Sequence, residues 1–244
     1  MNPRVCALVP TFDNPRTVGE VSRSLRGHVE HVLVVDDGSG AEARAALDRL
    51  AQEPGIEVLR RATNGGKGAA VKQGFEHALA QGFTHALQVD ADGQHAIEDV
   101  PAMLSACRGR PEALVLGAPV FDESAPAARL WGRQITTFWA RVECGSGAVG
   151  DALCGFRVYP LEAAIASGTR GDHMDFDPEI AVRMAWRGAP IVHVPTRIRY
   201  RTEVEGGVSH FRLLRDNAAI TRMHSRLMLE KIGRALLGRL GARR

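Results

Sequence analysis

Two aspartates that follow an apolar strand pattern are the residues of this chain best suited to bind a metal ion. The segment 87–94 is Leu-Gln-Val-Asp-Ala-Asp-Gly-Gln, which places Asp90 and Asp92 two residues apart. In an extended chain, residues i and i+2 point to the same side, so these two carboxylates can converge on one point. A divalent cation would relieve their repulsion, because Mg²⁺ takes one or two carboxylates together with substrate phosphates. Taken alone, the segment is equally compatible with a solvated turn after a strand.

Polar loops that suit a nucleotide follow two other strand patterns. The run 36–39 (Asp-Asp-Gly-Ser) closes an apolar stretch, and a carboxylate there can accept hydrogen bonds from a ribose or a base edge. The run 64–68 (Asn-Gly-Gly-Lys-Gly) precedes a helix pattern and offers backbone amides, a positive helix end and one ammonium, which suits a diphosphate. The run 64–68 has neither the P-loop nor the G-x-G-x-x-G spacing, which disfavours an ATPase or a dinucleotide site in this loop. A capped tight turn and a solvated lysine are the structural alternatives.

The elements that must position these loops alternate between strand and helix patterns through the first half of the chain. Apolar, β-branched runs predict strands at 4–9, 31–36, 56–60, 84–89 and 112–118. Amphipathic stretches predict helices at 15–26, 41–52, 67–81 and 97–108. This alternation indicates an α/β fold with a mostly parallel central sheet flanked by helices, in which ligands bind beyond the carboxyl ends of the strands. The polar loops fall at those ends.

The second half of the chain is less regular. Patterns there predict helices at 126–143 and 177–188 and a strand at 191–201, in which Pro195 indicates a sheet edge or a bulge. Trp131, Phe138 and Trp139 share one face of the first of these helices. Their spacing favours a stripe that faces the core over a wall that contacts lipid.

The bulk composition is that of an ordinary globular protein. Of the 244 residues, 45% are hydrophobic and 24% are charged, and four cysteines without a C-x-x-C pair disfavour a zinc site or a disulfide framework. No apolar run approaches the roughly 18–20 residues that span a bilayer. The chain opens on a strand pattern without a signal segment, so we expect a cytoplasmic protein.

A basic tail ends the chain. Residues 211–244 carry nine Lys or Arg against two acidic side chains, whereas the whole chain has a net charge of only +3. Apolar residues at helical spacing within this tail fit either an interfacial helix on anionic lipid or a helix packed on the domain. Aromatic residues do not interleave with the basic ones, which argues against nucleic acid as the partner. We therefore expect one catalytic domain (1–210) with a basic amphipathic helical extension (211–244), peripheral at the inner face of the membrane.

Taken together, these motifs resemble the family 2 glycosyltransferases, which have the nucleotide-diphospho-sugar (GT-A) fold. The similarity covers about residues 3–210, and the matching order is Pro-Thr at 10–11, the two polar loops and the D-x-D pair. The run 90–95 (Asp-Ala-Asp-Gly-Gln-His) is similar to that of the dolichyl- or polyprenyl-phosphate mannosyl- and glucosyltransferases. Asp151 with Gly155, Phe156 and Arg157 resembles the D-x-x-x-G-F-R/K motif of the same branch.

The resemblance implies an inverting, metal-dependent transfer of a sugar from a GDP- or UDP-sugar. It implies a donor site made by the first strand, both polar loops and the D-x-D run, namely Pro10, Thr11, Asp36, Asp37, Gly38, Asn64, Gly66, Lys67, Asp90, Ala91 and Asp92. Asp90, Asp92 and Gln94 would hold Mg²⁺ or Mn²⁺ against the diphosphate. The metal would act as a Lewis acid and neutralise charge on the departing nucleotide.

The resemblance also implies a lipid-linked or other membrane-proximal acceptor, such as polyprenyl phosphate. Its candidate ligands are Arg133, Thr137, Arg157, Arg201 and Ser209, of which Arg157 and Arg201 are equally compatible with ion pairs within the protein. Two positions depart from the branch: Pro119 replaces an expected arginine, and His210 replaces a lysine. A phosphate acceptor needs no general base, whereas a hydroxyl acceptor does, for which Asp175, Asp177, Glu179 and His210 are candidates. The predicted catalytic groups are thus Asp92, Arg133, Asp177, Glu179 and His210.

Three other functions remain as alternatives. The first is a transferase that acts on a hydroxyl of a small molecule or glycan, and the second is a non-catalytic nucleotide-sugar-binding module. The third, a sugar-phosphate nucleotidyltransferase, should carry a G-x-G-T/S-R-like loop after the first strand, and the run 10–13 (Pro-Thr-Phe-Asp) is not one.

Overall fold

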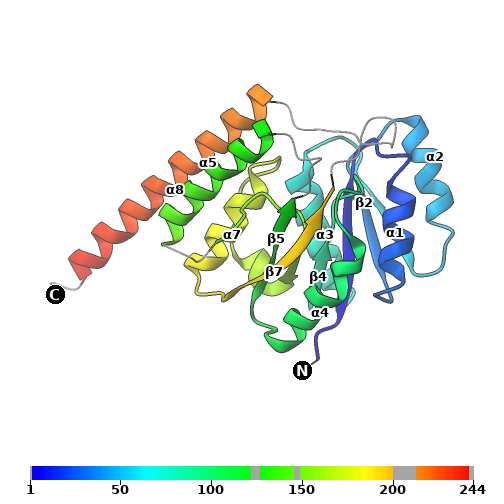
Figure 1. Cartoon of the computed structure of the whole chain (residues 1–244), viewed down its shortest axis with the longest axis horizontal. Helices are drawn as coiled ribbons and strands as arrows, with labels where there is room; N and C mark the ends of the chain where they lie inside the picture. Colours follow the sequence, from blue (N-terminus) through cyan, green and yellow to red (C-terminus); the bar gives the residue numbers. More distant parts are fainter. Residues whose placement is uncertain (1, 122–126, 146–148, 200–212, 242–244) are drawn as a thin grey trace.

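A seven-stranded sheet forms the centre of the molecule (Figure 1). The computed structural model describes residues 2–121, 127–145, 149–199 and 213–241. The strand order is β3-β2-β1-β4-β6-β5-β7, and within the described residues only β6 runs antiparallel to its neighbours. The strands are β1 (Val5–Thr11), β2 (Val32–Asp36), β3 (Ile56–Arg60), β4 (His85–Gln88), β5 (Leu114–Phe121), β6 (Arg157–Pro160) and β7 (Ile191–Ile198).

Helices cover both faces of this sheet. One apolar cluster joins the sheet to α1 (Val18–Arg26), α2 (Ala41–Leu50) and α4 (Val100–Gly109), which follows the short 3₁₀ turn η1 (Ile97–Asp99). The other joins it to α3 (Lys67–Ala80), α6 (Leu161–Ala166), α7 (Phe176–Trp186) and α8 (Leu213–Gly241). Helix α5 (Ala127–Cys144) packs on α7, and α8 lies beside it (Figure 1). Within the described residues, no helix has the length and apolar character needed to cross a membrane.

The sequence explains why the strands and helices form where they do. Strand β2 is Val-Leu-Val-Val-Asp and is buried on both faces, as expected for a central parallel strand covered by helices on each side. Helix α1 buries Val18, Val21 and Leu25, which recur at i, i+3 and i+7, and it ends before Gly27. Helix α3 approaches the sheet closely because Gly74 has no side chain: a Cβ there would lie 2.4 Å from Leu8 Cδ1.

The predicted α/β architecture and its parallel sheet are confirmed, with differences in the second half. The short elements β6 and α6 were not predicted. Strand β7 ends at Ile198, and its Pro195 lies on the last strand of the order, as its edge preference indicates.

The prediction that the aromatic face of α5 points into the core is wrong. Trp131 is 69% exposed and Phe138 is 59% exposed, and Trp139 is exposed as well. Helical spacing showed that these side chains share a face. It does not record whether another element packs on that face, and none of the described elements does.

The basic extension forms α8, and part of it packs on the domain. Ile220, Met223 and Leu227 are buried in the same apolar cluster as α3 and α7. The division of the chain into a domain at 1–210 and a tail at 211–244 stays a prediction.

Candidate active site

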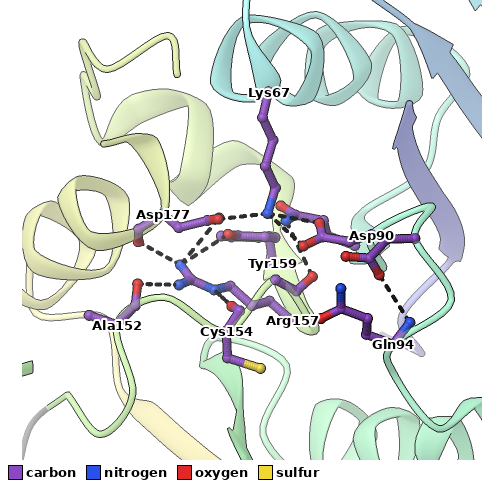
Figure 2. Close-up of polar contacts among 11 residues, drawn as sticks. Lys67, Asp90, Gln94, Ala152, Cys154, Arg157, Tyr159 and Asp177 are labelled. Atoms are coloured by element: carbon purple, nitrogen blue, oxygen red, sulfur yellow. Dashed lines mark hydrogen bonds and ion pairs between the residues drawn. The ribbon is translucent and has the colours of Figure 1, made fainter. Parts of the chain in front are cut away.

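The ammonium group of Lys67 lies at the centre of a partly buried charged cluster (Figure 2). Lys67 opens α3, and its Nζ lies 2.7 Å from Oδ2 of Asp177 and 2.8 Å from Oδ1 of Asp90. Burial by itself would lower the pKa of Lys67, but the carboxylates of Asp177 and Asp90 outweigh it and raise that pKa above its ordinary value. In the same way, burial would raise the pKa of Asp90, and Lys67 holds it below its ordinary value. The cluster is therefore charged at neutral pH.

The two predicted nucleotide loops lie side by side at the carboxyl ends of β2 and β3. Asp37 accepts hydrogen bonds from the backbone N–H groups of Gly65 (3.0 Å) and Gly66 (2.7 Å). The Nε of Arg61 lies 2.7 Å from Oδ1 of the same carboxylate. Gly38 allows this contact, because its φ is +78° and a Cβ there would lie 2.8 Å from the backbone N of Asn64. Asp37 thus shapes the glycine-rich loop, and Arg61 is a partner that the sequence analysis missed.

Neighbouring donor-site candidates also help to build these loops. The carboxylate of Asp36 accepts a hydrogen bond from the backbone N–H of Ser39 at 2.9 Å. The backbone oxygen of Thr11, in β1 directly after Pro10, accepts from the N–H of Asp37 at 2.9 Å. The backbone oxygen of Ala91 accepts from the Thr17 hydroxyl at 2.6 Å. These contacts place all of the predicted donor residues at one edge of the sheet, and their contacts with a nucleotide stay predictions.

The D-x-D run offers a donor set that fits a hard divalent cation. Asp90 and Asp92 follow β4, and the Asp92 carboxylate accepts a hydrogen bond from the backbone N–H of Gln94 at 3.0 Å. Within the described residues, no group of three His, Cys, Asp or Glu could enclose a metal. Two carboxylates and an amide oxygen leave ligand positions for phosphate oxygens and water, which is how Mg²⁺ is usually held. The residues present therefore fit Mg²⁺ or Mn²⁺ that is bound together with a diphosphate.

Gly155 provides the space that the Asp90 carboxylate occupies. A Cβ built on Gly155 would lie 2.2 Å from Oδ2 and 2.6 Å from Oδ1 of Asp90. A Gly155→Ala variant should therefore displace Asp90 from Lys67 and weaken the expected binding of a nucleotide-sugar donor and Mn²⁺ at least tenfold, with most of the fold retained. Calorimetric titration would measure the loss. Gly109→Ala is the matched control, since no neighbouring side chain lies within 4 Å of its added Cβ. Unchanged binding in Gly155→Ala would contradict the close approach of Asp90 to Gly155.

Arg157 has a structural position in place of the predicted contact with the acceptor. Its side chain is fully buried, and its N–H groups donate to the backbone oxygens of Ala152 (2.7 Å), Cys154 (2.6 Å) and Asp177 (2.7 Å). Figure 2 shows the guanidinium enclosed by these carbonyls. Because those carbonyl oxygens occupy most of its donors, Arg157 supports the loop before β6 and the start of α7.

Glu179, a predicted base, likewise has close partners of its own, and its role in catalysis stays a prediction. Its carboxylate is buried and paired with Arg183 on α7, and its Oε2 lies 2.7 Å from Nη2 of Arg226 on α8. The backbone N–H of Gly171 donates to it at 2.7 Å. Two arginines neutralise this carboxylate and a backbone N–H donates to it. Because Arg226 belongs to α8, the ion pair links α7 to α8.

The predicted acceptor residues are only partly within the described chain. Arg133 lies on α5 with its Nε 3.4 Å from Oδ2 of Asp151 and its guanidinium carbon 5.3 Å from the Phe121 ring centre. Thr137, one turn further on, is half-buried. Arg201, Ser209 and His210 lie outside the described residues.

His95 is a further group at the site that the sequence analysis quoted but did not select. Its ring is buried against Phe156, with ring centres 5.4 Å apart, and its Nδ1 has no hydrogen-bond partner among the described residues. Burial lowers the pKa of His95 to about 4, so the imidazole is neutral at pH 7. The sequence signal that could have identified His95 is that it directly follows the run 90–94.

Comparison with known proteins identifies the family. The profile described as Glycosyl transferase family 2 matches residues 6–164. The chain is 30% identical over 219 residues to polyprenol monophosphomannose synthase of Mycolicibacterium smegmatis, which covers 84% of this chain and 80% of that protein. It is 29% identical over 219 residues to undecaprenyl-phosphate mannosyltransferase of Micrococcus luteus, which covers 84% and 89%.

Solved structures show the same fold at lower identity. One is glucosyl-3-phosphoglycerate synthase of Mycobacterium tuberculosis in complex with Mn²⁺ and UDP-glucose. It is similar with a TM-score of 0.69 at 16% identity, over 95% of this chain and 79% of that one. The chain therefore belongs to glycosyl transferase family 2 and is a glycosyltransferase with the GT-A fold.

Proposed function

We propose that this glycosyltransferase moves a sugar, with inversion, from a GDP- or UDP-sugar to a lipid-linked phosphate such as polyprenyl phosphate. One observation carries the choice of a phosphate over a hydroxyl acceptor. Two of the four candidate bases are already engaged by cations: Asp177 pairs with Lys67, and Glu179 with Arg183 and Arg226. Of the other two, Asp175 accepts a hydrogen bond from the backbone N–H of His173, and His210 lies outside the described residues. A hydroxyl nucleophile needs a free base, whereas a phosphate monoester is already ionised near pH 7. The names of the two mannosyltransferase relatives agree with this choice.

The donor would bind along the edge formed by the loops after β1, β2, β3 and β4. Asp36 and Asp37 would face the base and ribose, and the glycine-rich loop with Lys67 would face the diphosphate. Asp90, Asp92 and Gln94 would hold Mg²⁺ or Mn²⁺, which when bound supplies a Lewis acid that neutralises the leaving nucleoside diphosphate. Lys67 adds a second positive charge close to the same group, since its Nζ is 2.8 Å from Asp90.

The acceptor phosphate would approach Arg133 on α5. Its contact with Asp151 is long, at 3.4 Å between Nε and Oδ2, so a phosphate could compete for the guanidinium. A bidentate guanidinium–phosphate pair would orient the attacking oxygen in line with the anomeric carbon. Thr137 would add a hydrogen bond from the next turn of the helix, and the basic extension would hold the enzyme at an anionic membrane surface.

The donor site is tested by thermal unfolding with UDP- and GDP-sugars in Mn²⁺, Mg²⁺ or EDTA, beside an Asp92→Asn variant. A ligand at about 100 times its dissociation constant should add about 2.7 kcal/mol, or about 5–10 °C for a chain of this length. We expect a metal-dependent shift with one base that is absent in Asp92→Asn, because the amide removes one anionic ligand. A shift that persists in EDTA or in Asp92→Asn would contradict the metal site.

The acceptor is tested by following transfer to polyprenyl phosphate and to the matching polyprenol, with mass spectrometry of the lipid products. We expect glycosylation of the phosphate alone. Equal or preferred transfer to the alcohol, or to a soluble glycan, would favour the hydroxyl-directed alternative. Donor hydrolysis and transfer that both stay at background, despite tight donor binding, would favour a non-catalytic binding module.

A further inference from the structure

The outer side of α5 is an apolar stripe that no described element covers. Trp131, Ile135 and Phe138 recur at i, i+4 and i+7, and all three are exposed, Trp131 by 69%. With Gln134 they line a shallow groove on the surface. The opposite side of the helix is buried through Thr136 and Ala140. Exposed Trp and Phe on one helix face are unusual on a solvated surface and mark an interaction site.

Helix α8 continues this surface with a stripe of its own. Leu229, Ile232 and Leu236 recur at i, i+3 and i+7, and Leu229 is 71% exposed. At 100° per residue they lie opposite the buried side chains of α8, such as Met223 and Leu227. The two helices are held together, because His224 lies 2.8 Å from Glu143 and Lys231 donates to the backbone oxygen of Val142. Figure 1 shows them running beside each other at one side of the molecule.

The charge of these two helices is strongly positive. Together they contain nine basic and three acidic residues. Glu143 and Asp216 are buried, and Glu230 is paired with Arg183 at 2.9 Å. In contrast, Arg141 and Arg222 are exposed. The exposed charge that accompanies the apolar stripes is therefore basic.

We propose that the outer face of α5 and α8 docks on an anionic lipid bilayer, with Trp131 and Phe138 entering the headgroup region. Aromatic and aliphatic side chains flanked by arginines are the composition that interfacial helices use. A second copy of this chain is a poorer occupant, because a two-fold contact would bring the same basic residues of both copies together. The aromatic stripe of α5 thus binds the membrane jointly with the basic extension.

The importance of this membrane docking for catalysis rests on the proposed transfer to a lipid-linked phosphate. Arg133 lies on α5 itself, on the side turned toward Asp151 and the site. Docking of α5 would therefore hold the proposed phosphate ligand within one helix diameter, roughly 10 Å, of the bilayer surface. Vesicle binding itself requires neither donor nor acceptor, so it can succeed or fail independently of the transfer reaction.

The test is sedimentation of the full chain with vesicles of phosphatidylcholine alone or mixed with phosphatidylglycerol. We expect binding to the anionic vesicles that weakens on the order of tenfold in a Trp131→Ser/Phe138→Ser variant, since about two large apolar side chains are withdrawn from lipid. Both residues are exposed, so the fold should be retained. Ile165→Ser on α6 is the matched control, as it removes an exposed apolar residue from another face.

Brominated lipids give a second measurement through tryptophan quenching. Trp131 and Trp139 should be quenched in anionic vesicles, whereas a Trp131→Phe/Trp139→Phe variant, which retains only Trp186, should not be. Unchanged vesicle binding in the serine variant would overturn the role of α5 and leave the basic extension alone. A dimer in solution that dissociates in the serine variant, without vesicle binding by the wild type, would assign the face to a second copy.

Discussion

A Lys67→Met variant should lose sugar transfer by on the order of a hundredfold or more, the scale on which removal of one preorganised charge acts. The ammonium separates the carboxylates of Asp90 and Asp177, which it contacts at 2.8 and 2.7 Å. Without it, the buried carboxylate of Asp177 and the partly exposed carboxylate of Asp90 face each other, so one must take up a proton or turn away. Either response changes the charge or the position of a carboxylate at the proposed diphosphate site. Initial rates and donor titration of the same preparation would measure the loss.

A double variant separates this electrostatic role from simple loss of packing. In Lys67→Met/Asp177→Asn the excess negative charge is removed. The loss of activity in this double variant should therefore be much smaller than the sum of the losses in the two single variants. Strict additivity, or a Lys67→Met variant with the rate of the wild type, would contradict the arrangement in Figure 2.

An Arg157→Met variant should be destabilised by about 3–5 kcal/mol, since removal of one partner from a buried charged network leaves the others unsatisfied. The guanidinium donates to three backbone oxygens, those of Ala152, Cys154 and Asp177, and a methionine can satisfy none of them. For a chain of this length we expect a fall of about 10 °C in the unfolding temperature. Differential scanning calorimetry measures it directly.

The control for this prediction is an ion pair of arginine with a carboxylate on the exposed surface. Arg23 pairs with Glu53 at 2.8 Å on the exposed surface, and Arg23→Met should cost less than about 1 kcal/mol. If both variants unfold at nearly the same temperature, the buried network around Arg157 does not stabilise the fold.

The fold was predictable where the chain alternates between buried β-branched runs and amphipathic helices. Strands such as β2 and helices such as α1 bury nearly every apolar residue that their patterns contain. Strand β6 was missed because it has only four residues and begins at a fully buried arginine, which a hydrophobicity pattern places outside the core. Its antiparallel direction depends on pairing with β4 and β5, which no local pattern records.

The candidate site was predictable as a set of loops, and less so as a set of contacts. The strand ends placed Asp37, Lys67 and Asp90 at one edge, and the structure brings them together there. Sequence indicates that an arginine can bind an anion, but Arg157 instead meets three carbonyl oxygens that converge from separate segments. The ion pairs of Glu179 could not be predicted for a related reason, because its partner Arg226 lies far along the chain on α8.

The span of the Lys67 contacts has a consequence for how activity is regained on refolding. Its ammonium joins Asp90, 23 positions away, to Asp177, 110 positions away. Closing the longer loop loses more chain entropy, so contacts of this kind form late compared with local helices. A species in which only the first five strands have assembled would lack Asp177 and would leave Lys67 half-paired. Donor binding should therefore return together with the slowest kinetic phase of refolding, after most of the helical circular dichroism has recovered.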